Sequence, residues 1–368
     1  MPWFFRMFAN AQQIKKHKIH MKHTTLLLSV AATLAFAVPA TAAKRNAAKT
    51  TNRQTIAQRE AGLRTINEDA ARAHVYFLAD DLLEGRRAGE RGSRIAKQYI
   101  ISQIREAGLK PLSGDSYEQP FEACGVQRLK RSPRFFVEAD SVAEIKKQVH
   151  QTMYLSNVLT VLPGKKSDEY VVVGAHLDHE GVYPDLEGDK IYNGADDNAS
   201  GVSAVLQILK AFKASGAQPE RTIIFAFWDG EEFGLLGSRY FTENFKDMAK
   251  VKGYLNFDMV GSGTGSKYLM YFFTAAHPTF GEWLKSDMKT YGFTTFEPDY
   301  RAWENPVGGS DQQSFHLKGV PIVWYHTGGQ PNYNFPSDEP QTINYPKLTD
   351  ITRASYLTTW RLANEAEY

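Results

Sequence analysis

The sequence predicts an α/β fold, a three-layer sandwich in which a mostly parallel mixed sheet is flanked by helices. From residue 157 onward, short apolar segments alternate with longer segments of helical periodicity, and several of the apolar segments have no polar face. Strands that are apolar on both faces belong to a sheet that helices cover on each side. The chain has 368 residues, of which 42% are hydrophobic. That is enough to bury the core of one large domain.

Each expected element follows from a local pattern of apolar residues. Strands are expected at residues 157–162, 170–175, 222–228, 254–258, 269–273 and 320–325. Helices are expected at residues 67–79, 90–107, 199–214, 278–291 and 346–363, and Gly108 is expected to cap the second of them. Residues 109–155 show no regular pattern, so no element is assigned there.

The N-terminal region has the composition of an export signal. Met21-Lys22-His23 precede an apolar run at residues 24–38, and Ala40-Thr41-Ala42 forms a small-residue cleavage site. Residues 1–42 are therefore expected to be a signal peptide, with residues 1–20 an upstream extension. Residues 43–58 are expected to form a flexible leader, and residues 59–368 a single domain. The apolar run is shorter than the ~20 residues of a membrane span, so no stable membrane anchor is expected and the protein is predicted to be periplasmic or secreted.

The charge of the chain does not favour a nucleic-acid partner, and its cysteine content excludes an intrachain disulfide. The chain carries 43 Lys and Arg against 41 Asp and Glu, but five of the basic residues lie within residues 1–43, which hold no acidic residue. The remainder has 38 basic and 41 acidic residues, so nothing in its charge favours nucleic acid as a partner. Cys124 is the sole cysteine, which excludes an intrachain disulfide.

Polar side chains that could carry chemistry follow the apolar strands. Ligands of an open α/β sheet bind outside the carboxyl ends of its strands. One imidazole and several carboxylates are expected at this edge: His176, Asp178, Asp196, Asp197, Glu231, Glu232 and Asp258. Such carboxylates would repel one another unless a cation lay between them, and imidazole together with carboxylate suits zinc.

The segments that carry these residues resemble peptidase family M28, the co-catalytic zinc aminopeptidases. The similar segments are AHLDHEG (175–181), NGADDNASG (193–201), FWDGEEFGLLGS (227–238), NFDMVG (256–261), GSDQQSFHLKGVP (309–321) and PNYNFPSDEPQTINY (331–345). LADDLLEGRRAGERGS (78–93) is similar to the lead-in of the family. The resemblance runs from about Leu78 to the C-terminus.

The resemblance implies a role for each matching residue. His176 and Asp258 would bind one zinc ion, Asp196 would bridge two ions, and Glu232 would bind the other. Glu231 would be the general base that takes a proton from water, and Asp178 would hold the imidazole of His176. The family also has a cis peptide bond at the position that matches Asp196–Asp197.

One position departs from the family pattern. The last ligand of the family is a histidine, and Asn334 stands in its place here. An asparagine offers only a neutral carbonyl oxygen, so the ion next to Glu232 is expected to be held more weakly, and the site would hold one or two zinc ions. His326 is a candidate substitute. Gln312 likewise stands where the family often has a histidine.

The resemblance implies an enzyme that hydrolyses N-terminal residues from peptides. Two alternatives stay open. Glutaminyl cyclases share the fold, although their single zinc ion uses the positions matching Asp196, Glu232 and the absent histidine. A degenerate member could instead bind peptides without turnover, because Asn334 replaces a ligand. A preference for C-terminal residues is also open, and the sequence does not determine the oligomeric state.

Overall fold

The computed structural model describes residues 53–128, 131–263, 265–305, 308–365 and 367–368. Residues 53–368 form one compact unit. The predicted signal peptide lies outside the described residues, as do residues 43–52 of the predicted leader. Residues 53–63 are helical, and this stretch includes residues 53–58 of the predicted leader.

A ten-stranded mixed sheet forms the middle layer, in the order β11-β10-β12-β9-β5-β8-β4-β2-β3 with β1 beside β4. The strands are β1 (Lys110–Pro111), β2 (Glu118–Arg128), β3 (Arg131–Phe136), β4 (Gln151–Leu162), β5 (Lys166–His176), β8 (Arg221–Trp228), β9 (Val251–Phe257), β10 (Tyr268–Thr274), β11 (Glu297–Trp303) and β12 (Ile322–His326). The central strands β12, β9, β5 and β8 run parallel, whereas β4, β2 and β3 pair antiparallel. β6 (Gly181–Val182) and β7 (Ile191–Tyr192) form a separate hairpin.

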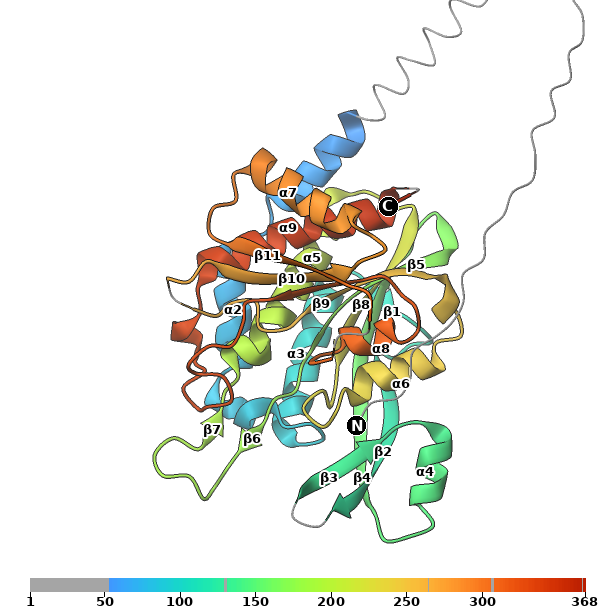
Figure 1. Cartoon of the computed structure of the whole chain (residues 1–368), viewed down its shortest axis with the longest axis vertical. Coiled ribbons are helices and arrows are strands. Elements are labelled where there is room, and N and C mark those ends of the chain that lie inside the picture. The colour runs from blue at the N-terminus through green and yellow to red at the C-terminus, as the bar shows by residue number, and fades with distance from the viewer. Residues whose placement is uncertain (1–52, 129–130, 264, 306–307, 366) are drawn as a thin grey trace, which may run out of the picture. The chain divides into compact units, whose positions relative to one another are not determined.

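Helices cover both faces of this sheet. The helices are α2 (Glu68–Leu78), α3 (Arg91–Glu106), α4 (Ala139–Ile145), α5 (Gly201–Ser215), α6 (Leu236–Asn244), α7 (Thr279–Tyr291), α8 (Gln312–His316) and α9 (Tyr345–Asn364). Figure 1 shows α5, α7 and α9 on one side of the central strands and α6 and α8 on the other. The predicted three-layer architecture is therefore confirmed.

The alternation of side chains along β5 explains both apolar faces. Val171 and Val173 belong to the large core cluster that includes residues of α2, α5 and α9, whereas Val172 belongs to the cluster that includes Phe241 of α6 and Phe315 of α8. Successive side chains of a strand point to opposite faces, so a strand between two helical layers must be apolar throughout.

A small lobe formed by β2, β3, α4 and the first part of β4 extends from one edge of the sheet (Figure 1). It occupies the segment for which the sequence predicted no element. β4 begins six residues before the strand expected at residues 157–162. The apolar pattern does not mark this first part because it includes exposed residues, among them Gln151 and Tyr154. Among the residues that the structure describes, no helix has both the length and the apolar character needed to cross a bilayer.

Candidate active site

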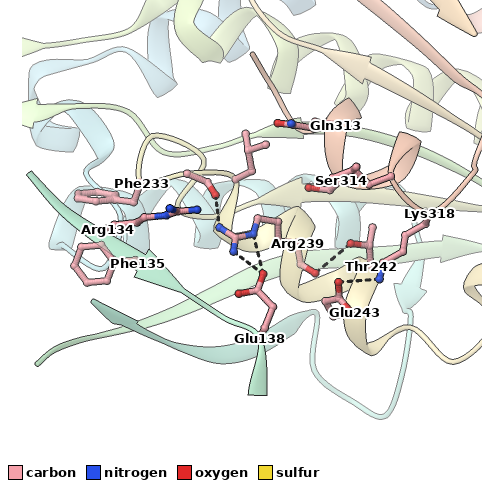
Figure 2. Close-up of a pocket in the computed structure, with 13 residues that line it drawn as sticks. Arg134, Phe135, Glu138, Phe233, Arg239, Thr242, Glu243, Gln313, Ser314 and Lys318 are labelled. Atoms are coloured by element: carbon pink, nitrogen blue, oxygen red, sulfur yellow. Dashed lines mark hydrogen bonds and ion pairs between the residues drawn. The ribbon is translucent and has the colours of Figure 1, made fainter. Parts of the chain in front are cut away.

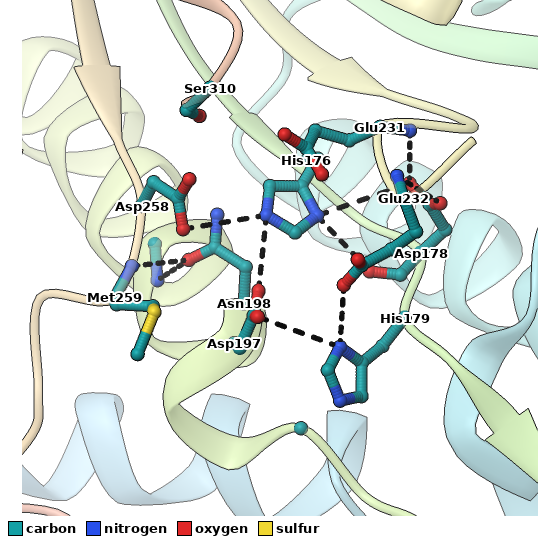
Figure 3. Close-up of polar contacts among 12 residues, drawn as sticks. His176, Asp178, His179, Asp197, Asn198, Glu231, Glu232, Asp258, Met259 and Ser310 are labelled. Carbon is teal, nitrogen blue, oxygen red and sulfur yellow. Dashed lines mark hydrogen bonds and ion pairs between the residues drawn. The ribbon is translucent and has the colours of Figure 1, made fainter. Parts of the chain in front are cut away.

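The predicted polar residues meet at one edge of the central sheet. His176 is the last residue of β5, Glu231 and Glu232 follow β8, and Asp258 follows β9. The turn Ala195–Ser200, which leads into α5, brings Asp197 to the same place. Figure 3 shows these side chains converging from four segments that are distant in the sequence. The carboxyl ends of parallel strands share one edge, which is why the segments meet.

The centre of the cluster is the imidazole of His176. Its Nε2 lies 3.2 Å from Oδ1 of Asp197 and 3.5 Å from Oδ1 of Asp258. His176, Asp197 and Glu232 offer ligand atoms that all lie within 4.8 Å of one another. Burial raises the pKa of Asp197, and it raises the pKa of Glu232 to about 7. A divalent cation would favour the charged forms of these carboxylates, so the donor set fits zinc.

Asp196, predicted as the bridging ligand, does not face this cluster. Its carboxylate accepts hydrogen bonds from the backbone N–H of Gly261 at 2.7 Å, from the hydroxyl of Ser200 at 3.1 Å and from the amide of Gln330 at 3.2 Å. The structure places Asp197 in the cluster instead. The cis peptide bond likewise joins Asp197 to Asn198, one residue later than expected.

The turn that presents Asp197 is held from several sides. The carboxylate of Asp338 accepts hydrogen bonds from the backbone N–H groups of Asp196 at 3.0 Å and of Asp197 at 3.0 Å. Gly194 precedes the turn with φ of 58°, and a Cβ atom there would lie 2.0 Å from the carbonyl oxygen of Asp197. Only glycine fits this position without moving the turn.

Asp178 contacts both histidine and glutamate segments. Its Oδ1 lies 3.9 Å from Nδ1 of His176 and accepts a hydrogen bond from the backbone N–H of Glu231 at 3.1 Å. Its Oδ2 accepts from the backbone N–H of Glu232 at 3.4 Å. Burial raises the pKa of Asp178 to about 7. The carboxylate of Asp178 thus lies near His176 but does not hydrogen-bond to its imidazole, because Nδ1 of His176 lies 3.2 Å from the backbone carbonyl oxygen of Asp178 instead.

His179 is part of the site although no role was predicted for it. Its imidazole is fully buried, and Nδ1 lies 2.8 Å from Oε1 of Glu232 and 3.8 Å from Oδ2 of Asp197. The sequence signal was present, because His179 follows His176 by three residues in the segment AHLDHEG. The spacing alone does not reveal that the chain turns back toward Glu232 after Asp178.

Neither Asn334 nor His326 contacts Glu232 through a hydrogen bond or ion pair that the described residues show. Asn334 is exposed and has φ of 57°. The imidazole of His326 lines the cavity, but its Nδ1 lies 2.8 Å from the carbonyl oxygen of Asp258. His326 therefore sits beside Asp258, whereas the histidine in contact with Glu232 is His179.

Arg86 supports the loops behind the cluster, a role that the sequence did not reveal. Its guanidinium is buried and donates hydrogen bonds to the carbonyl oxygens of Leu177 at 3.0 Å, Asn193 at 2.6 Å and Gly194 at 2.9 Å. These carbonyls flank His176 on one loop and Asp197 on the other. Burial lowers the pKa of Arg86 to about 10, so the side chain is charged at neutral pH.

A cavity of about 320 Å³ opens onto the cluster. Its polar lining consists of His176, Asp197, Glu231, Glu232, Asp258 and His326, and its less polar wall contains Met259, Trp324 and Tyr333. The rings of Trp324 and His326 stack with centroids 5.0 Å apart. This volume is large enough for about one amino-acid residue and too small for a folded protein segment.

A second cavity of about 440 Å³ lies between β3, α6 and α8 (Figure 2). The carboxylates drawn there are already paired with cations. Glu138 pairs with Arg239, and Glu243 pairs with Lys318 at 2.7 Å. Because these charges are mutually neutralised, this cavity differs from the first one, whose carboxylates contact histidines rather than lysine or arginine.

The chain is similar to known proteins over part of its length. Residues 157–359 match the family model described as Peptidase family M28. Leupeptin-inactivating enzyme 1 of Streptomyces exfoliatus is 32% identical over 176 residues, which cover 47% of this chain and 36% of that protein. The chain thus matches about a third of the length of that curated relative.

Two solved structures share the fold at low sequence identity. A zinc aminopeptidase from Bacillus subtilis superposes with a TM-score of 0.61 at 14% identity, covering 82% of this chain and 97% of that chain. A glutaminyl cyclase from Fimbriiglobus ruber superposes with a TM-score of 0.61 at 17% identity, covering 81% and 95%.

Proposed function

Because this chain belongs to peptidase family M28, we propose that it is a zinc-dependent peptidase that removes residues from the N-terminus of peptides. The observation that carries the proposal is the buried group of His176, Asp197 and Glu232, whose ligand atoms lie within 4.8 Å of one another beside a cavity. Its relatives and structural neighbours include aminopeptidases, which supports the same reaction class.

We assign the carboxylates and the imidazole to the metal as follows. His176 and Asp258 would hold one zinc ion, Glu232 would hold a second, and Asp197, whose carboxylate lies near both histidines, would contribute to both. The short distances from His176 to Asp197 and Asp258, 3.2 and 3.5 Å, support the first group. When bound, zinc polarises the scissile carbonyl group and lowers the pKa of water.

Glu231 is the proposed general base. It lines the cavity together with His176 and Asp258, and its backbone is held by Asp178. Adjacent glutamates cannot readily bind the same ion, so the arrangement leaves the carboxylate of Glu231 free to take a proton from water and pass it to the leaving amine. Burial raises the pKa of Glu231, which makes its carboxylate a stronger proton acceptor.

The walls of the cavity suggest how a peptide would be positioned. Trp324, Met259 and Tyr333 provide apolar surface next to the carboxylates. We propose that this surface receives the side chain of the terminal residue. The positive charge of a free N-terminus is attracted by the acidic cluster, and this favours the end of a peptide over its middle.

The test is mass spectrometry of a peptide mixture incubated with zinc-loaded protein. Peptides should lose residues one at a time from the N-terminus, and Glu231→Gln should reduce the rate by at least ~100-fold because the proton acceptor is lost. Glu282→Gln on the exposed side of α7 is the matched control and should leave the rate unchanged.

Other products would overturn the proposal. Loss of ammonia from peptides that begin with glutamine would indicate cyclisation, and shortening from the C-terminus would indicate a carboxypeptidase. Capture of peptides without any product would indicate a binding protein.

We further propose that the reaction takes place outside the cytoplasm, in the periplasm or the medium. The support is the basic, apolar and small-residue pattern of residues 21–42. N-terminal sequencing of protein secreted by its source cells should give Ala43 as the first residue, and an intact Met1 would contradict export.

A further inference from the structure

We propose that His179 is the histidine ligand of the second zinc ion, in the place that Asn334 leaves without an imidazole. This inference rests on the proposed function and adds one residue to its metal site. The ion beside Glu232 would otherwise have only two protein ligands, the carboxylates of Glu232 and Asp197. Zinc sites in enzymes usually have three protein ligands, among which imidazole is common.

The position of His179 supports the assignment. Its Nδ1 contacts Oε1 of Glu232 at 2.8 Å and lies 3.8 Å from Oδ2 of Asp197. Those two residues are the carboxylates proposed to hold the second ion. Asn334, in contrast, is exposed, and its amide offers only a neutral carbonyl oxygen to a metal ion.

Asp197 belongs to two sets of possible zinc ligands, each made of one imidazole and two carboxylates (Figure 3). Oδ1 of Asp197 lies 3.2 Å from Nε2 of His176, which is also 3.5 Å from Asp258. Oδ2 of Asp197 faces Nδ1 of His179, which is also in contact with Glu232. Each half thus contains one imidazole nitrogen and two carboxylate oxygens. Ligand atoms about 2.1 Å from one zinc ion are roughly 3.4 Å apart at the tetrahedral angle, and the four distances lie on either side of that value.

Packing fixes the ring of His179 in this orientation. A Cβ atom at residue 194 would lie 2.5 Å from Cδ2 of His179, so the ring rests directly against Gly194. The ring centroid of Tyr192, in β7, lies 6.5 Å from that of His179. Nε2 of His179 is buried and has no hydrogen-bond partner among the described residues. A buried imidazole whose polar contacts are two acidic groups is suited to a cation between them.

The experiment measures zinc stoichiometry by mass spectrometry of the metal after equilibrium dialysis. The unaltered protein should bind two zinc ions per chain. His179→Gln retains a hydrogen-bond donor toward Glu232 but supplies a poor zinc ligand, so it should bind one ion and weaken the second by more than ~100-fold. Adding Asn334→His to His179→Gln should restore the second ion, because it returns an imidazole to the family position.

The controls separate this inference from the proposed function. His150→Gln, a partly exposed histidine outside the site, should keep two ions. Two ions in His179→Gln would overturn the role of His179, which would then only orient Glu232, and would leave the peptidase assignment intact. One ion in the unaltered protein would also overturn it. No zinc in the unaltered protein would overturn the proposed function itself. Circular dichroism of each variant verifies that it is folded.

Discussion

Arg86 shows how one buried side chain can organise a whole site. Its guanidinium is fixed by carbonyl groups of two loops, one next to His176 and the other next to Asp197. Arginine suits this position because its planar group has five donors in a rigid arrangement, whereas lysine has a single ammonium group.

We expect Arg86→Lys to lower the free energy of unfolding by about 3 kcal/mol, since several buried carbonyl oxygens would lose their donors. Arg91→Lys, at an exposed position of α3, should change it by less than ~0.5 kcal/mol. Denaturant unfolding of the two variants measures the difference. Equal stabilities would show that the carbonyl groups do not depend on Arg86.

His74 is buried, and Nδ1 of its imidazole lies 2.8 Å from the hydroxyl oxygen of Tyr99. Burial, together with the positive charge of Lys210, lowers the pKa of His74 to about 4. In the unfolded chain the pKa is about 6.5. The unfolded state therefore binds a proton that the folded state does not, so stability is lost as the pH falls from 6.5 toward 4.

Between pH 6.5 and pH 5 this linkage amounts to about 2 kcal/mol. His74→Gln should reduce the difference in unfolding free energy between pH 7 and pH 5 by that amount. Urea titrations at the two pH values measure it, with His150→Gln as the histidine control. An unchanged difference in His74→Gln would mean that another group causes the acid sensitivity.

At the scale of elements, patterns of apolar residues predicted the parts that are covered on both sides. The central strands and α5 lie in the interior, so burial determines nearly every position. The lobe of β2, β3 and α4 was not predicted, because strands at the edge of a sheet are only partly covered and mix polar with apolar residues. β11 was not predicted either, because its residues are half-buried or exposed.

The site shows the same limit at finer resolution. The strand ends that carry His176, Glu231 and Asp258 follow from the sheet, and the structure brings these residues together. Asp196 and Asp197 are adjacent and chemically identical, so only the backbone of the turn decides which one faces the cluster. The contact of His179 with Glu232 depends on loop geometry, which no periodicity encodes.

An ion pair connects two of these elements. Nζ of Lys97 in α3 lies 2.5 Å from Oδ2 of Asp229, which follows β8 and precedes Glu231. Both side chains are buried, and Asp229 also accepts a hydrogen bond from the backbone of Ser156 at 3.0 Å. The pair therefore holds the loop of Glu231 against α3.

We expect Lys97→Met to lower the free energy of unfolding by about 3–5 kcal/mol, because it leaves the carboxylate of Asp229 buried without a cation. The double variant with Asp229→Asn should recover at least half of the loss, since the remaining amide is uncharged. Denaturant unfolding of the single and double variants gives the coupling. A double variant no more stable than Lys97→Met would contradict this account.

At the scale of the whole molecule, metal should act as a cross-link between β5, β8, β9 and the turn before α5. Zinc at 1,000 times its dissociation constant stabilises a folded protein by about 4 kcal/mol. For a domain of this size, that corresponds to a melting temperature about 6 °C higher. Chelation should lower the melting temperature by this amount, and added zinc should restore it, as differential scanning calorimetry can measure.

Glu231→Gln separates binding from catalysis in the same measurement. Because Glu231 is not among the proposed ligands, the variant should keep the thermal response to zinc while losing turnover. A melting temperature of the unaltered protein that does not change on chelation would contradict the presence of a metal site.

The turn Ala195–Ser200 depends on residues from opposite ends of the chain. Arg86 reaches it from the N-terminal side, and Asp338, 142 residues beyond Asp196, reaches it from the C-terminal side. During synthesis the ribosome therefore adds Asp338, whose carboxylate binds the backbone of the turn, after His176, Asp197, Glu232 and Asp258. We therefore expect a polypeptide that ends before Asp338 to carry these four side chains while its turn lacks the contact that holds the backbone of Asp197.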